Sequence, residues 1–156
     1  MYGWKNGVMY EHNSDTINWN NFYDVYYPVR LCFPCNTDPS ALKVLNNIAL
    51  ESNAIPDFTV ALTEIPNIQI TDLSIEDENW ENQEGIMYAD FFKDRISPNA
   101  SGTADEKMRN GDDLTDIAIK IMCEWQAYES LFFINFVDIG FSVSRGQKQI
   151  LNPVNK

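Results

Sequence analysis

The stretches Phe58-Thr-Val-Ala-Leu-Thr63 and Ile139-Gly-Phe-Ser-Val-Ser144 alternate large apolar residues with polar or small ones at every second position. Successive side chains on a strand point to opposite faces, so this period predicts strands with one face in a core and the other in solvent. In the first stretch we expect Phe58, Val60 and Leu62 on the buried face. Little of the chain repeats at helical spacing, and the pattern therefore predicts a β-rich domain.

Other segments extend this pattern along the chain. The Asn6-Gly7 pair lies between aromatic and apolar residues and predicts a tight hairpin. Pro28 and Pro34 lack the backbone donor that a central strand needs, so the expected strand 26–35 should be an edge strand or a bulged strand. The remaining expected strands cover residues 43–51, 58–65, 85–92, 117–125, 131–137 and 139–145, with a further one beginning at Ile68 and Ile70.

The segment 114–128 allows two readings, helix or strand. Some of its apolar residues recur at four-residue spacing, as on a helix face, yet apolar residues also occupy every second position. We favour a strand because the two-residue period is the more continuous of the two. The residues on its buried face would be Ile117, Ile119, Ile121, Cys123 and Trp125.

Loops and one long apolar stretch complete the pattern. Residues 74–84 read as an acidic loop with Trp80 as an exposed anchor, and residues 93–113 read as a long polar loop. The almost wholly apolar stretch 131–137 is expected to be a central strand covered on both faces. Together these segments predict an all-β fold: a jelly-roll-like antiparallel β-sandwich of about eight to ten strands, with long polar loops and little or no helix.

The domain organisation follows from the same reading. A chain of 156 residues suits one domain with its own core. We expect a single β-sandwich domain over residues 1–146 and a polar C-terminal tail over residues 147–156. The first residues read as the middle of a strand, and we expect the chain to be a fragment of a longer protein.

Composition excludes several classes of function. With 23 acidic and 11 basic residues the chain has a formal net charge of −12, the opposite of the basic surface that sequence-specific nucleic-acid binding needs. An acidic wall could still let DNA slide past without binding it. No apolar stretch is long enough to cross a membrane as a helix.

Candidate catalytic and metal-binding groups are few. Cys32 and Cys35 have the spacing of a redox pair, but residues three apart on a strand point to opposite faces, so we expect two separate thiols. A zinc site would need further ligands, for which only Cys123 and His12 are available. The acidic residues follow no calcium-loop pattern, although a pair of them could in principle hydrolyse glycosides. We therefore expect no catalytic residue, no cofactor and no metal.

Tryptophans suggest an alternative binding function. Flat aromatic faces stack on sugars, and a β-sandwich could be a carbohydrate-binding module. Trp125 lies on an apolar face and is expected in the core. Trp80 and Trp19 occur in polar loops and are the candidate contacts to a ligand, such as a glycan, or to a protein partner.

Several short motifs follow one another along the chain: Trp4-Lys-Asn-Gly-Val-Met-Tyr-Glu-His-Asn13, Asn21-Phe-Tyr23, Tyr27-Pro28, Asn36 to Pro39, Lys43-Val-Leu-Asn-Asn-Ile48, Glu84-Gly-Ile-Met-Tyr88, Asp94-Arg95, Met108-Arg-Asn-Gly111 and Ser142-Val-Ser-Arg145. Their order resembles the C-terminal region of the tail nozzle, muzzle or stabilisation proteins of short-tailed bacteriophages, including the crAss-like group. Asp24 departs from the family pattern, because glycine is expected after Asn-Phe-Tyr.

The resemblance implies a structural function in the virion. Such a domain would be non-enzymatic, would be made in the bacterial cytoplasm, and would end in the phage tail. Its partners would be other copies of itself and neighbouring tail and portal proteins, with no membrane and no sequence-specific nucleic acid. Its function would be to contribute to tail assembly and to genome retention and passage.

Overall fold

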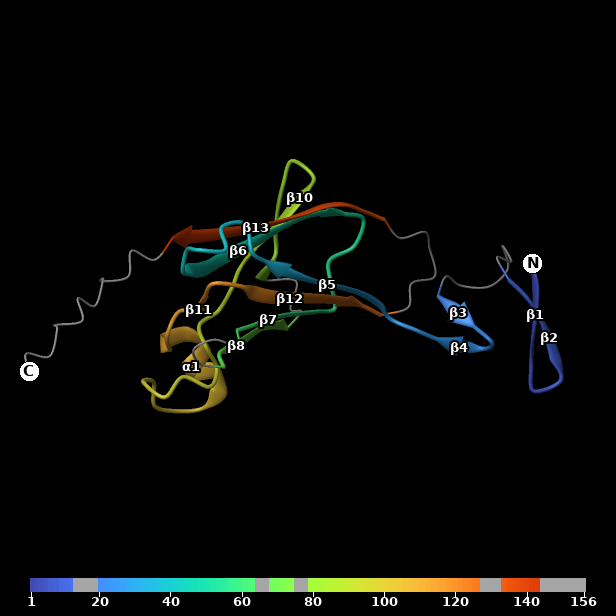
Figure 1. Cartoon of the computed structure of the whole chain (residues 1–156), viewed down its shortest axis with the longest axis horizontal. Coiled ribbons are helices and arrows are strands. Elements are labelled where there is room, and N and C mark those ends of the chain that lie inside the picture. Colours follow the sequence, from blue (N-terminus) through green and yellow to red (C-terminus); the bar gives the residue numbers. More distant parts are fainter. Residues whose placement is uncertain (13–19, 64–67, 75–78, 127–132, 144–156) are drawn as a thin grey trace, which may run out of the picture.

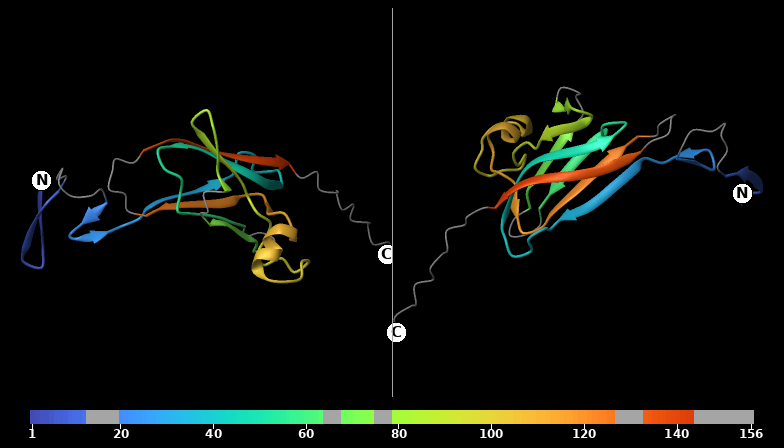
Figure 2. Two further views of the ribbon diagram at one scale, coloured as in Figure 1. Left: turned by 180° about the vertical axis from the view of Figure 1, so that it is seen from behind. Right: turned by 90° about the horizontal axis from the view of Figure 1, so that it is seen from above.

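The computed structural model describes residues 1–12, 20–63, 68–74, 79–126 and 133–143. Nine of the strands form a five-stranded and a four-stranded sheet, which face each other as in a sandwich (Figures 1 and 2). The strands are β1 (Tyr2–Lys5), β2 (Val8–Glu11), β3 (Asn21–Phe22), β4 (Val25–Tyr26), β5 (Val29–Cys35), β6 (Lys43–Ser52), β7 (Phe58–Leu62), β8 (Ile70–Ser74), β9 (Glu81–Gln83), β10 (Ile86–Asp90), β11 (Thr115–Asp116), β12 (Ile119–Trp125) and β13 (Ile134–Val143), and the helix is α1 (Ala104–Asn110).

All strand pairs are antiparallel, as the sequence predicts. In the five-stranded sheet, β6 pairs with β13 along one side and with β10 and β11 along the other, and β9 extends the sheet beyond β10. The four-stranded sheet has the order β5-β12-β7-β8. β5 is an edge strand, which confirms the position expected from Pro34, because an edge strand can lack one ladder donor.

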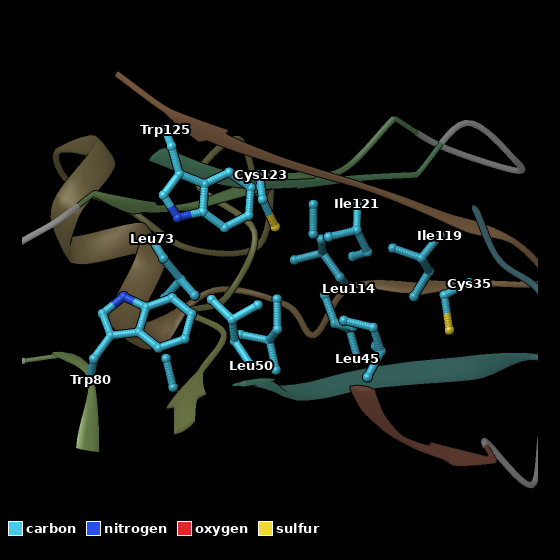
Figure 3. Packing of buried hydrophobic residues seen from close by; sticks show 14 residues of the cluster. Cys35, Leu45, Leu50, Leu73, Trp80, Leu114, Ile119, Ile121, Cys123 and Trp125 are labelled. Carbon is cyan, nitrogen blue, oxygen red and sulfur yellow. The ribbon is translucent and has the colours of Figure 1, made fainter. Parts of the chain in front are cut away.

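The core lies between the two sheets (Figure 3). β12 contributes one alternating row of completely buried side chains, and the long strand β6 faces it with Leu45 and Leu50. Burial of each large apolar side chain contributes about 1.5–3 kcal/mol. The row on β12 is Ile119, Ile121, Cys123 and Trp125, which confirms the strand reading of this segment.

The predicted orientation of β7 is wrong. Thr59 and Ala61 are completely buried, as is Thr63 just after the strand, whereas Phe58, Val60 and Leu62 face away from the core. The cause is the pairing with β12, in which Ala61 lies opposite Ile121. Cross-strand partners share a face, so small residues on β7 leave room for the bulky row on β12.

Three further expectations need correction. Ile117 is 43% exposed, because the chain bends there between β11 and β12. The stretch 131–137 is not a central strand covered on both faces: residues 134–137 belong to β13, whose pairing partner among the described strands is β6 and which has Phe136 on the solvent side. The loop 93–113 contains α1, whose first turn is held by a capping box between Thr103 and Glu106.

The acidic segment 74–84 begins at the last residue of β8 and is not a loop at its other end. Its end forms β9, which hairpins back into β10 through Glu84-Gly85, both at positive φ. The expected polar tail, residues 147–156, lies outside the described part of the chain.

Candidate functional site

Two short hairpins at the N-terminal end extend away from the sandwich (Figures 1 and 2). We call the described residues 1–12 and 20–27 the arm. β1 and β2 turn at Asn6-Gly7, where both residues have positive φ, so the predicted hairpin is confirmed. β3 and β4 form the second hairpin, which continues through Pro28 into β5.

Tyr23 joins the two hairpins of the arm. Its ring packs edge-on against Tyr10, with 5.0 Å between the ring centroids, and the ammonium of Lys5 lies 5.1 Å from its centre. Its hydroxyl lies so close to Gly3 that a Cβ there would meet it at 3.0 Å. One face of the first hairpin is therefore used for packing inside the arm.

The other face of this hairpin, which we call the free face, is mostly exposed to solvent. Trp4 lies opposite Met9, and Tyr2 lies opposite Glu11, so these four side chains share one face. Trp4 is 69% exposed, and Tyr2 and Met9 are also mostly exposed. Large apolar residues gathered on one exposed face are typical of a protein interface.

A second apolar surface lies on the sandwich. We call the side of the sheet β5-β12-β7-β8 that faces away from the core the outer face. The large residues of β7 point toward this face, opposite to the predicted orientation. Apolar residues on β5, β12 and β8 lie beside them in the strand register and add to the apolar surface. These residues are Cys32, Pro34, Phe58, Val60, Leu62, Ile70 and Met122.

A groove of about 410 Å³ opens at one end of the outer face. It lies where β5 and β7 end and β12 begins, at the end of the sandwich opposite the arm (Figure 1). Its lining is mostly apolar, with Lys120 as its exposed charge. The groove is lined by Cys32, Phe33, Pro34, Leu62, Asp116, Ile117, Ala118 and Lys120.

The two sheets differ in the charge that they present to solvent. On the outer face, Arg30 pairs with Glu124 at 2.6 Å, and Arg95 pairs with Asp72, while Lys120 has no ion pair within the described residues. The solvent side of the five-stranded sheet has acidic residues and no basic one among its described residues. Those acidic residues are Glu51, Glu81, Asp90 and Asp138, as the strand register and the buried neighbours indicate.

Cys32 and Cys35 lie on different sides of their strand, as their spacing predicts. Cys32 is exposed and Cys35 is buried, and both are free thiols. Burial raises the pKa of Cys35, an effect that Lys43 only partly offsets. Burial also raises the pKa of Cys123 to about 11. Thiols whose pKa is raised stay protonated and are poor nucleophiles.

The two tryptophans proposed as ligand contacts are not exposed binding residues in the described part of the chain. The expectation that Trp80 is exposed is wrong: it is only 8% exposed and belongs to the core cluster beside Leu73 (Figure 3). The acidic sequence around it suggested a solvent position, but the chain enters β9 there and turns the indole inward. Trp19 lies outside the described residues.

His12 also has a structural position. Its imidazole packs edge-on against Tyr23, with 5.4 Å between ring centroids, and its backbone N–H donates to the carbonyl of Met1 at 2.7 Å. Within the described ranges, no three His, Cys, Asp or Glu side chains gather closely enough to hold a metal ion. Nor is any described helix long and apolar enough to cross a membrane.

Sequence reasoning missed both apolar surfaces. The signal for the arm was present, because the first 27 residues are rich in Trp, Tyr and Phe and poor in charge. The outer face carried no such signal, because its apolar residues were assigned to the core.

Comparisons with known proteins identify one family. The sequence profile of the crassvirus muzzle protein C-terminal domain matches residues 17–94. The match covers half of the chain and includes β3 to β10, so it contains strands of both sheets. A comparison with curated proteins finds no match.

Proposed function

The chain belongs to the family of crassvirus muzzle protein C-terminal domains, a component of a phage virion, and on this premise we propose that it is a non-enzymatic part of the phage tail. Its function would be that of a nozzle or stabilisation protein, which contributes to tail assembly and to genome retention and passage. It would be made in the bacterial cytoplasm and incorporated into the virion. The family match is the observation that carries this proposal.

The surfaces of the chain support a function based on protein contacts. Both the free face of the arm and the outer face of the four-stranded sheet expose large apolar side chains, such as Trp4 and Phe58. Burial of such residues against another protein is the main driving force for association. Other copies of the chain and neighbouring tail and portal proteins are the partners that we propose.

The charge distribution is compatible with genome passage. DNA carries one phosphate charge per about 1.7 Å of helix axis, so a surface whose charged residues are all acidic repels it and does not bind it. The described solvent side of the five-stranded sheet is such a surface, with Glu51, Asp90 and Asp138. We propose that this side faces the path of the DNA where the assembled tail brings the two close together.

The carbohydrate-binding alternative gains nothing from the geometry. It relied on exposed tryptophans in loops, and Trp80 is part of the core. The family match gives this alternative no support either, so we do not pursue it.

The test is quantitative peptide mass spectrometry on purified phage particles. We expect peptides of the chain at a constant ratio to the portal protein of the same particles, across independent preparations. A phage replication protein from the same lysate is the matched control and should be lost on purification. Particles that contain the portal but lack the chain would refute the proposed function.

A further inference from the structure

We propose that the arm of one copy docks into the groove of a second copy, so that successive copies are joined head to tail. This inference deepens the proposed function, on which it rests, by naming the two surfaces that join the copies. It is argued from the free face of the arm, the groove, their charges and their positions at opposite ends of the molecule.

The arm has an unpartnered face. Gly3, Lys5 and Tyr10 face inward toward Tyr23, while the side chains on the opposite side of the first hairpin are mostly exposed. Two-stranded hairpins are marginally stable by themselves in water. A partner that covers the free face would therefore both fix the arm and remove its apolar side chains from water. The side chains available for this contact are Tyr2, Trp4, Met9 and Glu11.

The groove matches this face in chemistry. Ile117 and Leu62 provide apolar walls, and Lys120 adds one cation. On the arm, aromatic side chains lie beside one carboxylate, that of Glu11. An aromatic anchor in a pocket with a charge pair at its rim is the usual composition of a binding hot spot.

Charge indicates that the occupant is a second copy of the chain. With a net charge of −12, two copies repel each other over most of their surfaces. The outer face has three basic residues and two acidic ones, so it is less acidic than the solvent side of the other sheet; they are Arg30, Arg95, Lys120, Glu124 and Asp72. The described arm has one basic residue, Lys5, and two acidic ones, Glu11 and Asp24. Two copies of the chain can therefore bind through these two surfaces without strong repulsion.

The positions of the two surfaces determine the type of contact. The arm continues into the start of β5 at Val29, whereas the groove is lined by the end of the same strand, near Pro34. At about 3.3 Å per residue, a strand of this length separates them by roughly 16 Å, and the arm extends away from the sandwich (Figure 1). An arm therefore does not fill the groove of its own chain. A contact between two different surfaces is heterologous, and its repetition builds rings or filaments.

The test is sedimentation velocity of the full chain over a range of concentrations. The wild type should form oligomers beyond the dimer. Trp4→Ala removes the anchor, and Ile117→Glu places a charge in the groove at a position that is 43% exposed. Each variant alone should raise the dissociation constant by about thirtyfold. Lys120→Glu is a second groove variant and should also weaken association. Phe136→Glu, at a 38% exposed position on the solvent side of the other sheet, is the matched control and should associate like the wild type.

A mixture of two variants gives the sharpest result. Trp4→Ala keeps an intact groove and Ile117→Glu keeps an intact arm, so the mixture should form a one-to-one complex that neither variant forms alone. A wild type that stays monomeric, or a mixture without this complex, would overturn the inference. Thermal melts of each variant confirm that it is folded. Since the composition of the particles is measured separately, such a failure would leave the proposed function standing.

Discussion

The buried hydroxyl of Thr71 provides a direct test of how the four-stranded sheet faces the core. Thr71 on β8 is paired with Ala61 on β7, and both are completely buried. The Oγ1 atom of Thr71 has no hydrogen-bond partner among the described residues. Burial of a hydroxyl without a partner costs about 1–3 kcal/mol. Thr71→Val replaces it with a methyl group of nearly the same shape and should therefore stabilise the fold.

The expected gain in the free energy of unfolding is about 1–2 kcal/mol, at the lower end of that range because the core can relax around the hydroxyl. For a chain of this size, this gain raises the melting temperature by about 2–8 °C. Urea denaturation gives the free energy directly, and the m-value should not change because the surface exposed on unfolding is the same.

Thr63 is the matched control for this substitution. It is also completely buried, but its Oγ1 accepts a hydrogen bond from the backbone N–H of Gln69 at 2.9 Å. Thr63→Val leaves that donor without its partner and should destabilise the fold by about 1–3 kcal/mol. Opposite signs for Thr71→Val and Thr63→Val are the expected result. If Thr71→Val destabilises as much as Thr63→Val, the side chain of Thr71 does not have the surroundings described, and the reasoning is wrong.

Three other predictions test the orientation of β7 and the state of the cysteines. Ala61→Lys places a charge in the core and should prevent folding. Val60→Lys, on the outer face, should lower the free energy of unfolding by less than about 1.5 kcal/mol. Equal effects of the two substitutions in urea denaturation would contradict the assigned faces. The folded chain should react rapidly with a thiol reagent at Cys32 alone, while Cys35 and Cys123 should react only after unfolding; rapid reaction of all three would refute their burial. Burial raises the pKa of Cys123 from 9.0 to about 11, so its contribution to stability is complete below pH 9 and is lost as the pH rises toward 11. At pH 10 the wild type should have lost about 1.4 kcal/mol of its free energy of unfolding through this thiol. When unfolding is measured at pH 8 and at pH 10, the decrease in the free energy of unfolding should therefore be smaller for Cys123→Ala than for the wild type.

The sequence predicted the fold class well because side-chain period is a local property. Strand positions such as those of β6 and β12 follow from alternation alone, and the edge position of β5 follows from Pro34. The positive-φ turn at Asn6-Gly7 is equally local, since its two residue types tolerate that conformation better than others.

The face that each strand presents to the core is not a local property. In β7 the larger residues suggested the buried face, but the register with β12 places Ala61 beside the bulky Ile121. A sandwich core has a fixed thickness, so large residues on one strand require small ones on the next. Only the pairing of distant segments determines this choice, and the sequence alone does not show that pairing.

The same limit explains why the outer face and its groove were missed. The outer face is apolar because β7 has the opposite orientation from the predicted one, and the groove combines ends of three strands that are distant in sequence. Trp80 shows the converse error: acidic neighbours suggested an exposed indole, while the entry into β9 buries it.

The most direct test of the whole account is cross-linking mass spectrometry on purified phage particles with an amine-reactive reagent. Lys5 lies in the arm and Lys120 lines the groove, at opposite ends of one molecule (Figure 1). Head-to-tail docking of copies in the virion brings Lys5 of one copy close to Lys120 of the next. The account predicts a Lys5–Lys120 cross-link among peptides of the chain in the particles. Particles in which the chain is present but Lys5 is linked only to other sites would contradict the docking, and particles without the chain would contradict the virion function itself.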